Sequence, residues 1–245
     1  MNKSIIVSVF LLLIFSFSLS SQRSHLGFSL GTSIPQSFYA QSEDIFNDGY
    51  AIPGFPITFE GIYYPISIVG VGGMLSFGSL YANKDLYIDD FLEYAYEQTE
   101  IPIFPYPLRA EDLNTETGFW NYVNLMAGPE ISVPFWRFQA GIRAFGGLNF
   151  AVYPRRDIDY SDGNNQLIAS TKGLSVSPAY LFGGNILYRS PSGTGIKIGA
   201  DYLHGMSKYD FMMETVFTGS SQKIEREEEI ELEAISISLG FFYVF

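Results

Sequence analysis

The last eleven residues alternate between large apolar side chains and small or polar ones. Counting back from Phe245, every second residue is large and apolar as far as Ile235, and Gly240, Ser238 and Ser236 lie between them. A period of two places the two sets on opposite faces of a β-strand. A tilted strand needs about 9–11 residues to cross a bilayer, so the segment is predicted to span a membrane with one face toward lipid.

The same alternation, rich in aromatic and β-branched residues, recurs along the chain. It marks eight predicted strands, at about 24–34, 54–64, 68–82, 118–133, 135–153, 173–189, 194–207 and 229–245. Short turns at 65–67, 134 and 190–193 alternate with long connections at 35–53, 83–117, 154–172 and 208–228. Membrane barrels with an even number of strands have this asymmetry. The predicted fold is all-β, an eight-stranded antiparallel transmembrane β-barrel with long extracellular loops.

Charge follows the same division of the chain. There are 26 acidic and 14 basic side chains, and most of the acidic ones fall in the long connections. An acidic chain without a basic patch is a poor binder of nucleic acid, so no nucleic acid is expected as a partner. The absence of cysteine excludes disulfides and thiolate metal sites.

The N-terminus has the layout of a secretory signal peptide. Lys3 gives a positive start, an apolar run extends from Ile5 to Leu19, and residues 20–22 are small or polar. The run is shorter than the roughly 20 residues that a spanning helix needs. Residues 1–21 are therefore expected to be a cleaved signal peptide, and residues 22–245 a single barrel domain.

Strand parity predicts which charged side chains face the barrel interior. An Arg or Lys exposed to lipid costs about 2–4 kcal/mol at the midplane, so basic residues on the strands should point inward. The predicted lumen charge network balances three acidic against three basic side chains: Glu60, Glu130, Asp201, Arg137, Arg143 and Lys197. Because eight strands leave an interior just wide enough for side chains, a paired set would fill it. The alternative is a path for protons or ions.

The final strand predicts where the membrane ends. Upstream of Ala234 the alternation changes phase, so that Glu231 and Glu233 point outward. Placing a carboxylate in the hydrocarbon region of a bilayer costs free energy, so the membrane boundary is predicted near residue 234. Above it the strands are expected to continue into water around a small apolar interior.

The connection at 83–117 is the best functional candidate in the sequence. It carries several aromatic residues, three prolines and a net charge of −7, from two basic and nine acidic side chains. Aromatic side chains on a rigid scaffold suit recognition. The same rings would also serve to pack the loop onto the barrel rim, and both interpretations stay open.

Neither an enzyme nor a cofactor is expected. His204 and Ser207 are three residues apart, which does not place them on one strand face, so no nucleophilic site emerges. Residues 157–164 resemble a calcium loop but lack the required Gly at position six and Glu at position twelve, which favours an Asp-Gly turn. The acidic run 225–229 is interpreted as a solvated edge that deters strand pairing.

Two segments carry a resemblance to known proteins. Phe241, Tyr243 and Phe245 resemble the C-terminal assembly signal of bacterial outer-membrane barrels, and residues 25–31 look like the first strand of Bacteroidota barrels, including PorT-like secretion-associated ones. With its strand count and loop asymmetry, the chain resembles small barrels of the OmpX, OmpW and OmpA-transmembrane type. The resemblance implies the bacterial outer membrane, contact with outer-membrane lipid and lipopolysaccharide, and insertion by the barrel-assembly machinery.

Two functions are compatible with these observations. The first is a non-enzymatic barrel whose acidic, aromatic loops, notably 83–117, bind a surface partner or another component of an outer-membrane assembly. A secretion-associated role belongs to this hypothesis. The alternative is a narrow channel or a conduit for hydrophobic ligands, and the balanced interior charges argue against it.

Overall fold

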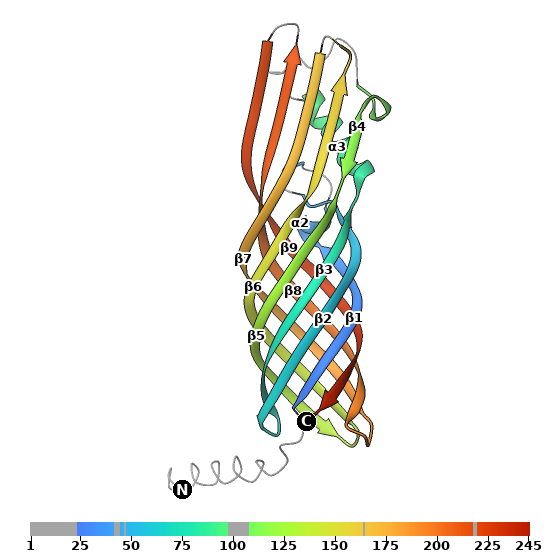
Figure 1. Cartoon of the computed structure of the whole chain (residues 1–245), viewed down its shortest axis with the longest axis vertical. Coiled ribbons are helices and arrows are strands. Elements are labelled where there is room, and N and C mark those ends of the chain that lie inside the picture. Colours follow the sequence, from blue (N-terminus) through green and yellow to red (C-terminus); the bar gives the residue numbers. More distant parts are fainter. Residues whose placement is uncertain (1–23, 42–44, 47, 98–107, 164, 218–219) are drawn as a thin grey trace, which may run out of the picture.

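Eight strands form a closed antiparallel ring in the computed structural model, which confirms the predicted fold class (Figure 1). The structure describes residues 24–41, 45–46, 48–97, 108–163, 165–217 and 220–245, so the predicted signal peptide lies outside the described residues. The ring strands are β1 (His25–Gln36), β2 (Ala51–Ile66), β3 (Val69–Ala82), β5 (Phe119–Phe135), β6 (Phe138–Ser161), β7 (Asn165–Arg189), β8 (Thr194–Phe217) and β9 (Ser220–Val244).

The ring closes where the first strand meets the last one. β1 pairs with β2 on one side and with β9 on the other, in register from His25 opposite Val244 to Gln36 opposite Glu233. The backbone N–H of Phe245 donates to the carbonyl of Ser24 at 2.9 Å, which brings the two ends of the described barrel together. Among the described residues, four elements lie outside the ring: α2 (Ser37–Ala40), α3 (Lys84–Glu97), a 3₁₀ turn η2 (Ala110–Asp112) and β4 (Asn114–Thr117).

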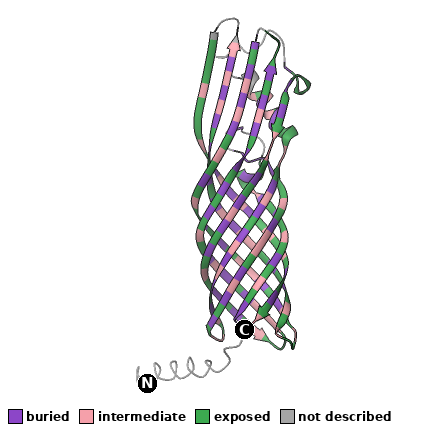
Figure 2. Ribbon diagram, viewed as in Figure 1, coloured by how far each residue is buried: buried purple, intermediate pink, exposed green. Residues whose placement is uncertain are grey.

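The strand faces follow the predicted parity. Along β8, Ile196 and Ile198 are exposed while Lys197 between them is buried. Buried and exposed residues alternate in this way along the barrel strands (Figure 2). The inner face therefore carries the polar and charged side chains, and the outer face forms an apolar belt.

Two of the four predicted long loops are mostly β-strand in the structure, so the prediction of loops there is wrong. β6 and β7 extend through most of 154–172, and β8 and β9 extend through most of 208–228. In this upper part Ile158 and Leu167 are buried on the inner face, while Asp159 and Gln166 are exposed on the outer face. A strand in water carries charge on its outer face, so charge density alone did not distinguish it from a loop. The strands therefore continue beyond the level of Ala234, as predicted, while the membrane boundary at that level stays a prediction.

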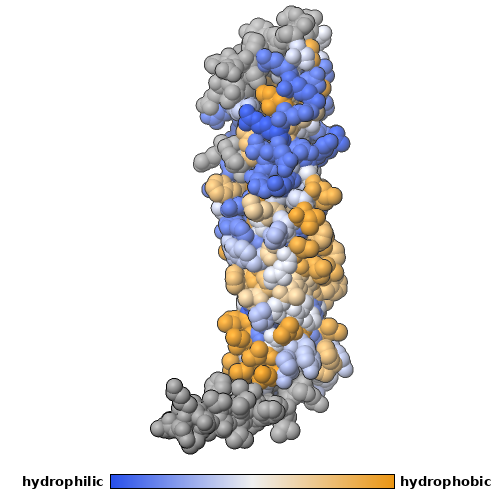
Figure 3. All heavy atoms as spheres, turned by 90° about the vertical axis from the view of Figure 1, so that its left-hand side faces the viewer, coloured by the Kyte–Doolittle hydropathy of each residue, from blue (hydrophilic) through white to orange (hydrophobic). Residues whose placement is uncertain are grey.

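We call this part of the structure the upper sheet. It consists of 154–161 of β6, 165–172 of β7, 208–217 of β8 and 220–232 of β9, with β4 paired to β6. It rises at the top of Figure 1, and α3 lies behind its strands. The surface coloured in Figure 3 is mainly hydrophilic over the upper half and carries most of its hydrophobic side chains over the barrel below.

The two remaining long connections pack onto the upper sheet. Tyr39 of α2 and Tyr87 and Phe91 of α3 are buried in one cluster with inward side chains of β5 to β8, such as Trp120 and Phe211. The ring of Tyr39 meets Trp120 edge-on at a centroid distance of 5.0 Å. For these rings of the 83–117 connection, packing onto the rim is the interpretation that the structure supports. No helix in the described part of the chain is long and apolar enough to cross a membrane.

Candidate functional site

A buried ion network occupies the lumen toward the lower end of the barrel, near the start of β1. Arg143 of β6 contacts two carboxylates: its NH1 donates to Glu60 at 2.5 Å, and its Nε and NH2 donate to Asp201 at 2.9 and 2.6 Å. Lys197 of β8 forms a further ion pair with Glu60. His25 of β1 lies 3.8 Å from the same carboxylate. Four of the six predicted charges, Glu60, Arg143, Lys197 and Asp201, are thus brought together, and we call them the lumen ion network.

Glu130 of β5 sits beside this network with neutral partners. One carboxylate oxygen accepts a hydrogen bond from the Tyr64 hydroxyl at 2.5 Å, and the other accepts one from Asn185 at 3.2 Å. Gln139 donates to the Tyr64 oxygen and to Ser132, both at 2.9 Å. Most polar atoms of this group thus have a hydrogen-bond partner, although the Asn185 side-chain oxygen has none among the described residues. The interior is therefore filled by connected side chains.

Arg137 does not join the lumen. It lies with Trp136 in the turn between β5 and β6, where it is exposed and its guanidinium stands 5.2 Å from the Trp136 ring centroid. Trp136 has φ +56°, so the chain reverses there and β6 begins at Phe138. The prediction treated 135–153 as one uninterrupted strand, so alternation assigned Arg137 to the inner face. The turn at Trp136 makes that assignment wrong. His25 was not predicted to belong to the network, but it lies near Glu60.

A further buried cation, which the sequence did not single out, lies in the upper sheet. Arg156 of β6 is fully buried, and its guanidinium carbon lies 4.6 to 5.0 Å from the ring centroids of Tyr50, Tyr87 and Tyr153. Its NH2 donates to the Gly49 carbonyl at 2.5 Å. Cation–π contacts of this kind are worth about 0.5–2 kcal/mol each. They tie the first connection, α3 and β6 into one unit.

The tyrosines around Arg156 sit in a dry environment. Burial raises the pKa of the Tyr87 hydroxyl, while the Arg156 charge opposes that rise. Burial likewise raises the pKa of Tyr209, whose ring stacks on Tyr153 at 3.8 Å. The hydroxyl of Tyr50 donates to Asp90 of α3 at 2.6 Å. These contacts close the barrel above the lumen with aromatic side chains.

Polar side chains replace apolar ones on the outer face at the level of His204 on β8. Its ring stacks on Tyr180 at a centroid distance of 4.7 Å, and its Nδ1 lies 3.2 Å from a carboxylate oxygen of Glu233. The hydroxyl of Tyr202 donates to the same oxygen at 2.7 Å. His204 therefore lies beside Tyr202 on the outer face, as expected for an interfacial side chain, whereas Ser207 is buried and points inward.

β9 offers a free edge above this level. Its pairing with β1 ends at Glu233, and residues 220–232 pair with β8 on one side only, while α2, which directly follows β1, contacts β9. Within the described part of the chain, no strand pairs with their other side. The segment carries five acidic and two basic side chains, a net charge of −3 (2 − 5). On its inner side, half-buried Ile224 packs against the apolar core. Arg226 lies above the ring of Phe46, which meets the rings of Tyr94 and Phe211 edge-on.

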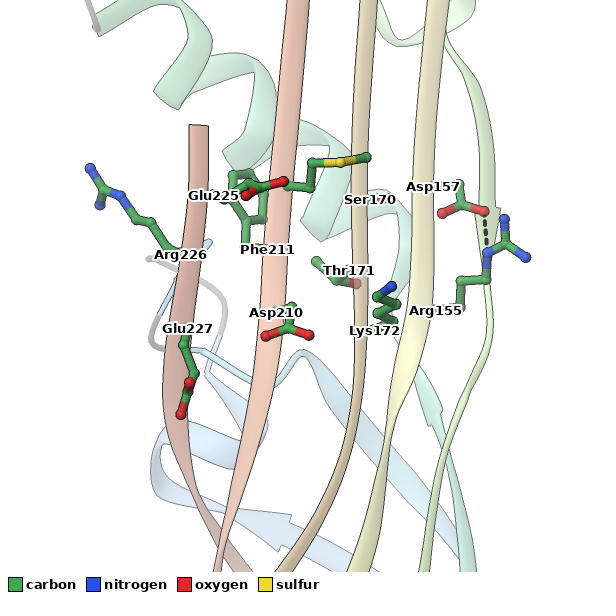
Figure 4. A pocket seen from close by; sticks show the side chains of 11 residues that line it. Arg155, Asp157, Ser170, Thr171, Lys172, Asp210, Phe211, Glu225, Arg226 and Glu227 are labelled. Carbon is green, nitrogen blue, oxygen red and sulfur yellow. Dashed lines mark ion pairs between the residues drawn. The ribbon is translucent and has the colours of Figure 1, made fainter. Parts of the chain in front are cut away.

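Two hollows mark the outer face of β7, β8 and β9. The upper hollow has a volume of about 660 Å³ and is lined by charged side chains, including Lys172, Asp210 and Glu227, side by side on the three strands (Figure 4). At its far end, Arg155 and Asp157 form an ion pair at 2.6 Å. The lower hollow, of about 480 Å³, shares Asp210 and Glu227 and extends down among apolar side chains.

The structure also locates the C-terminal aromatic residues and the predicted turn within residues 157–164. Phe241, Tyr243 and Phe245 lie exposed on the outer face at the end of the chain, while Phe242 between them is buried. Residues 162–163 form a turn, with Gly163 at φ +88° and Asp162 accepting a hydrogen bond from the Asn165 backbone at 2.7 Å. In the residues described, no group of His, Asp or Glu side chains has the arrangement of a metal site.

Comparison with known proteins finds similar barrels at low identity. No family model matches the chain, and no curated protein matches it by sequence. The crystal structure of Neisserial surface protein A aligns with TM-score 0.43 and 11% identity over 91% of this chain and 97% of that one. Ail, the attachment invasion locus protein of Yersinia pestis, aligns with TM-score 0.40 and 11% identity over 91% and 99%.

A third similar structure comes from Thermus thermophilus. A major outer membrane protein of Thermus thermophilus aligns with TM-score 0.45 and 9% identity over 91% of this chain and 99% of that one. A likeness at this level says nothing about what the chain binds or does. The resemblance to PorT-like proteins stays a prediction.

Proposed function

We propose that this chain is a non-enzymatic barrel of the bacterial outer membrane whose upper sheet binds a protein partner outside the cell. The belt of exposed apolar side chains around the ring supports the membrane location, because a soluble monomer rarely exposes so continuous an apolar surface. The upper sheet, with its charged outer face, then stands in water beyond the bilayer. Short turns at the lower end support assigning that end to the periplasm.

The free edge of β9 is the observation that carries the partner-binding function. Unpaired backbone N–H and C=O groups along residues 220–232 can accept a further strand, the mode in which sheet edges bind extended peptides. Five carboxylates line the edge, so a second copy of the same edge would be repelled. An extended segment with basic side chains would be attracted by the same charges.

The inner side of the edge is apolar, so the partner segment is expected to carry apolar residues as well as basic ones. Ile224 is half-buried there and packs against the apolar core. A strand added to β9 would place every second side chain over these apolar groups. The expected partner segment therefore alternates apolar and basic residues. Binding through α3 is less well supported, because Tyr87 and Phe91 are already buried in the core.

A peptide-binding assay tests this proposal. Protein folded in detergent micelles should bind a strand-length peptide of alternating Val and Lys, and should bind a Val and Glu peptide much more weakly. Reversing Glu225, Glu227 and Glu229 to Lys should weaken binding of the basic peptide by roughly tenfold or more. A basic peptide with a central proline, which cannot continue a strand ladder, should also bind weakly.

The matched control reverses three exposed carboxylates of α3 instead. Asp85, Asp89 and Glu93 provide the same change of charge at the loop that the sequence favoured. If the α3 variant loses peptide binding and the β9 variant keeps it, the edge is not the binding surface. Co-purification of both variants from native membranes in mild detergent then compares their natural partners.

A conduit is the weaker proposal for this barrel. The lumen ion network and the hydrogen-bonded group around Glu130 occupy the lower interior, and aromatic side chains around Arg156 lie above them. These layers support a closed interior. Purified protein in a planar bilayer is expected to give no steady conductance, and stable single-channel steps would favour the conduit.

A further inference from the structure

Trp136, at the tip of the turn between β5 and β6, is exposed in a backbone conformation that costs free energy. Its φ of +56° lies in the left-handed region, which bulky residues rarely adopt. The residue is 81% exposed, so burial within the described part of the protein does not offset that cost. A group from outside the chain is therefore expected to cover its ring.

A row of aromatic rings continues from this tip along the outer wall. Phe138 stacks on Phe135 at a centroid distance of 5.5 Å, and its ring lies 6.3 Å from that of Trp136. On β7, the ring of Tyr188 lies 5.1 Å from Phe138. Phe135 belongs to the exposed apolar belt, so the row joins the belt to the lower rim of the barrel. Aromatic rows of this kind are typical of the interface between membrane and water.

Two arginines stand at the same rim. The Arg137 guanidinium lies 5.2 Å from the Trp136 ring centroid, and the backbone N–H of Arg189 donates to the Arg137 carbonyl at 2.8 Å. Of the charged side chains described at this end of the barrel, in 24–28, 60–73, 128–143, 184–199 and 238–245, only these two are exposed. The net charge of the chain is −12, so this end is basic within an acidic protein.

Both arginines line a small hollow at the rim. Its volume is about 30 Å³, and Trp136, Phe138 and Gln139 also belong to its lining. Among the described residues, no Asp or Glu side chain lines it. The hollow has room for about two water-sized atoms, so an occupant would place only one end in it and lie mostly outside. Guanidinium groups are well suited to bind phosphate oxygens through paired N–H donors.

We propose that the rim formed by Arg137 and Arg189 binds the phosphate of an anionic phospholipid from the inner leaflet. The phosphate accepts hydrogen bonds from both guanidinium groups, and the glycerol and upper acyl carbons cover Trp136, Phe138 and Phe135. A zwitterionic headgroup fits less well, because its amine meets no exposed carboxylate side chain among the described residues of this end.

This inference rests on the proposed membrane insertion, in which the short turns face the periplasm. The membrane then offers phospholipid headgroups at the level of Arg137. The lipopolysaccharide expected in the outer leaflet lies at the other end of the apolar belt, toward the charged upper sheet. The rim and the free edge of β9 are at opposite ends of the molecule, so each can be tested without the other.

The fluorescence of Trp136 in lipid nanodiscs provides the test. The bilayers consist of phosphatidylcholine with a small fraction of either phosphatidylglycerol or phosphatidylcholine that carries bromine on its acyl chains, close to the glycerol. Bromine quenches a tryptophan in contact with it. At equal mole fraction, the brominated phosphatidylglycerol should be preferred at Trp136 by about fivefold or more. Trp136→Phe measures the background from Trp120, which is 1% exposed.

Replacing both rim arginines, by Arg137→Gln with Arg189→Gln, should abolish the preference for phosphatidylglycerol. The matched control, Arg109→Gln with Arg155→Gln, removes the same charge from arginine side chains that are 75% and 77% exposed elsewhere. The control should keep the wild-type preference. Dissolved glycerol phosphate, which offers a phosphate without acyl chains, should not reduce the quenching.

The possible results separate this inference from the proposed function. Equal preference in the wild type and the rim variant would overturn the site, and displacement by glycerol phosphate would overturn the lipid as its ligand. Absence of quenching by both brominated lipids would also overturn it, and would leave Trp136 to a soluble partner. Each protein is first checked for a heat-dependent band shift of the folded barrel. A wild type without that shift would count against membrane insertion itself, whereas a shift with unselective quenching would count against the rim alone.

Discussion

Replacement of Arg143 by Met should destabilise the barrel far more than the same replacement of Arg137. The Arg143 side chain is 1% exposed and donates three hydrogen bonds to Glu60 and Asp201. Glu60 would keep Lys197, but the Asp201 side chain, only 11% exposed, would lose both hydrogen bonds to the guanidinium. Removing one partner of a buried pair costs about 3–5 kcal/mol. Since water reaches Asp201 slightly, the expected loss lies near about 3 kcal/mol.

Equilibrium unfolding by guanidinium in phospholipid vesicles measures this loss, with tryptophan fluorescence as the signal. Arg137→Met, in an exposed turn, should change the free energy of unfolding by less than about 0.5 kcal/mol. Adding Asp201→Asn to Arg143→Met should recover about 1 kcal/mol or more, because it removes the stranded charge. Equal effects of Arg143→Met and Arg137→Met would refute the reasoning, and so would an unchanged double variant.

Three further predictions concern the cage around Arg156, the barrel wall and the tyrosines. Arg156→Met should speed amide hydrogen exchange of residues 48–50 and leave exchange in the lower barrel unchanged, because the tie to the Gly49 carbonyl is lost. Unchanged exchange at 48–50 would contradict this role. Gly183→Ala should cost about 1–3 kcal/mol of unfolding free energy, since its methyl would collide with an Asp201 carboxylate oxygen. Gly146→Ala, with nothing within 4 Å, is its control. In an alkaline titration, burial raises the pKa of a set of tyrosines above the unfolded value of about 10, so their stabilising effect is complete below that pH and falls as pH rises above it. Phenolate absorbance should then rise together with unfolding, and full ionisation of the folded barrel would contradict burial of Tyr50, Tyr87, Tyr153 and Tyr209.

The barrel itself was predictable because parity is a local property of the sequence. Ile196, Lys197 and Ile198 alternate in sequence and alternate in exposure. The phase change near Ala234 likewise reported a real change on the outer face, where Glu233 lies beside His204. Parity holds only while a strand continues, which is why it misplaced Arg137 beyond the turn at Trp136.

The upper sheet shows where local reasoning ends. Charged residues at 154–172 and 208–228 favoured loops, yet a strand in water presents such residues on one face. The apolar residues spaced by two, such as Tyr209, Phe211 and Met213, were the available signal. Arg156 could not be found in the same way. Its burial depends on Tyr50 and Tyr87, which come from two other segments and meet it only in the folded chain.

The seam between β1 and β9 has a consequence for the order of folding. It joins residues as far apart as His25 and Val244, whereas β6 with β7 and β8 with β9 are hairpins of adjacent strands. Contacts between distant residues form late, because a long loop must close first. The two long hairpins, and with them the upper sheet, are therefore expected to form early. Pairing of the first strand with the last would then complete the barrel. Unfolding by force or by denaturant should begin with the separation of these two strands.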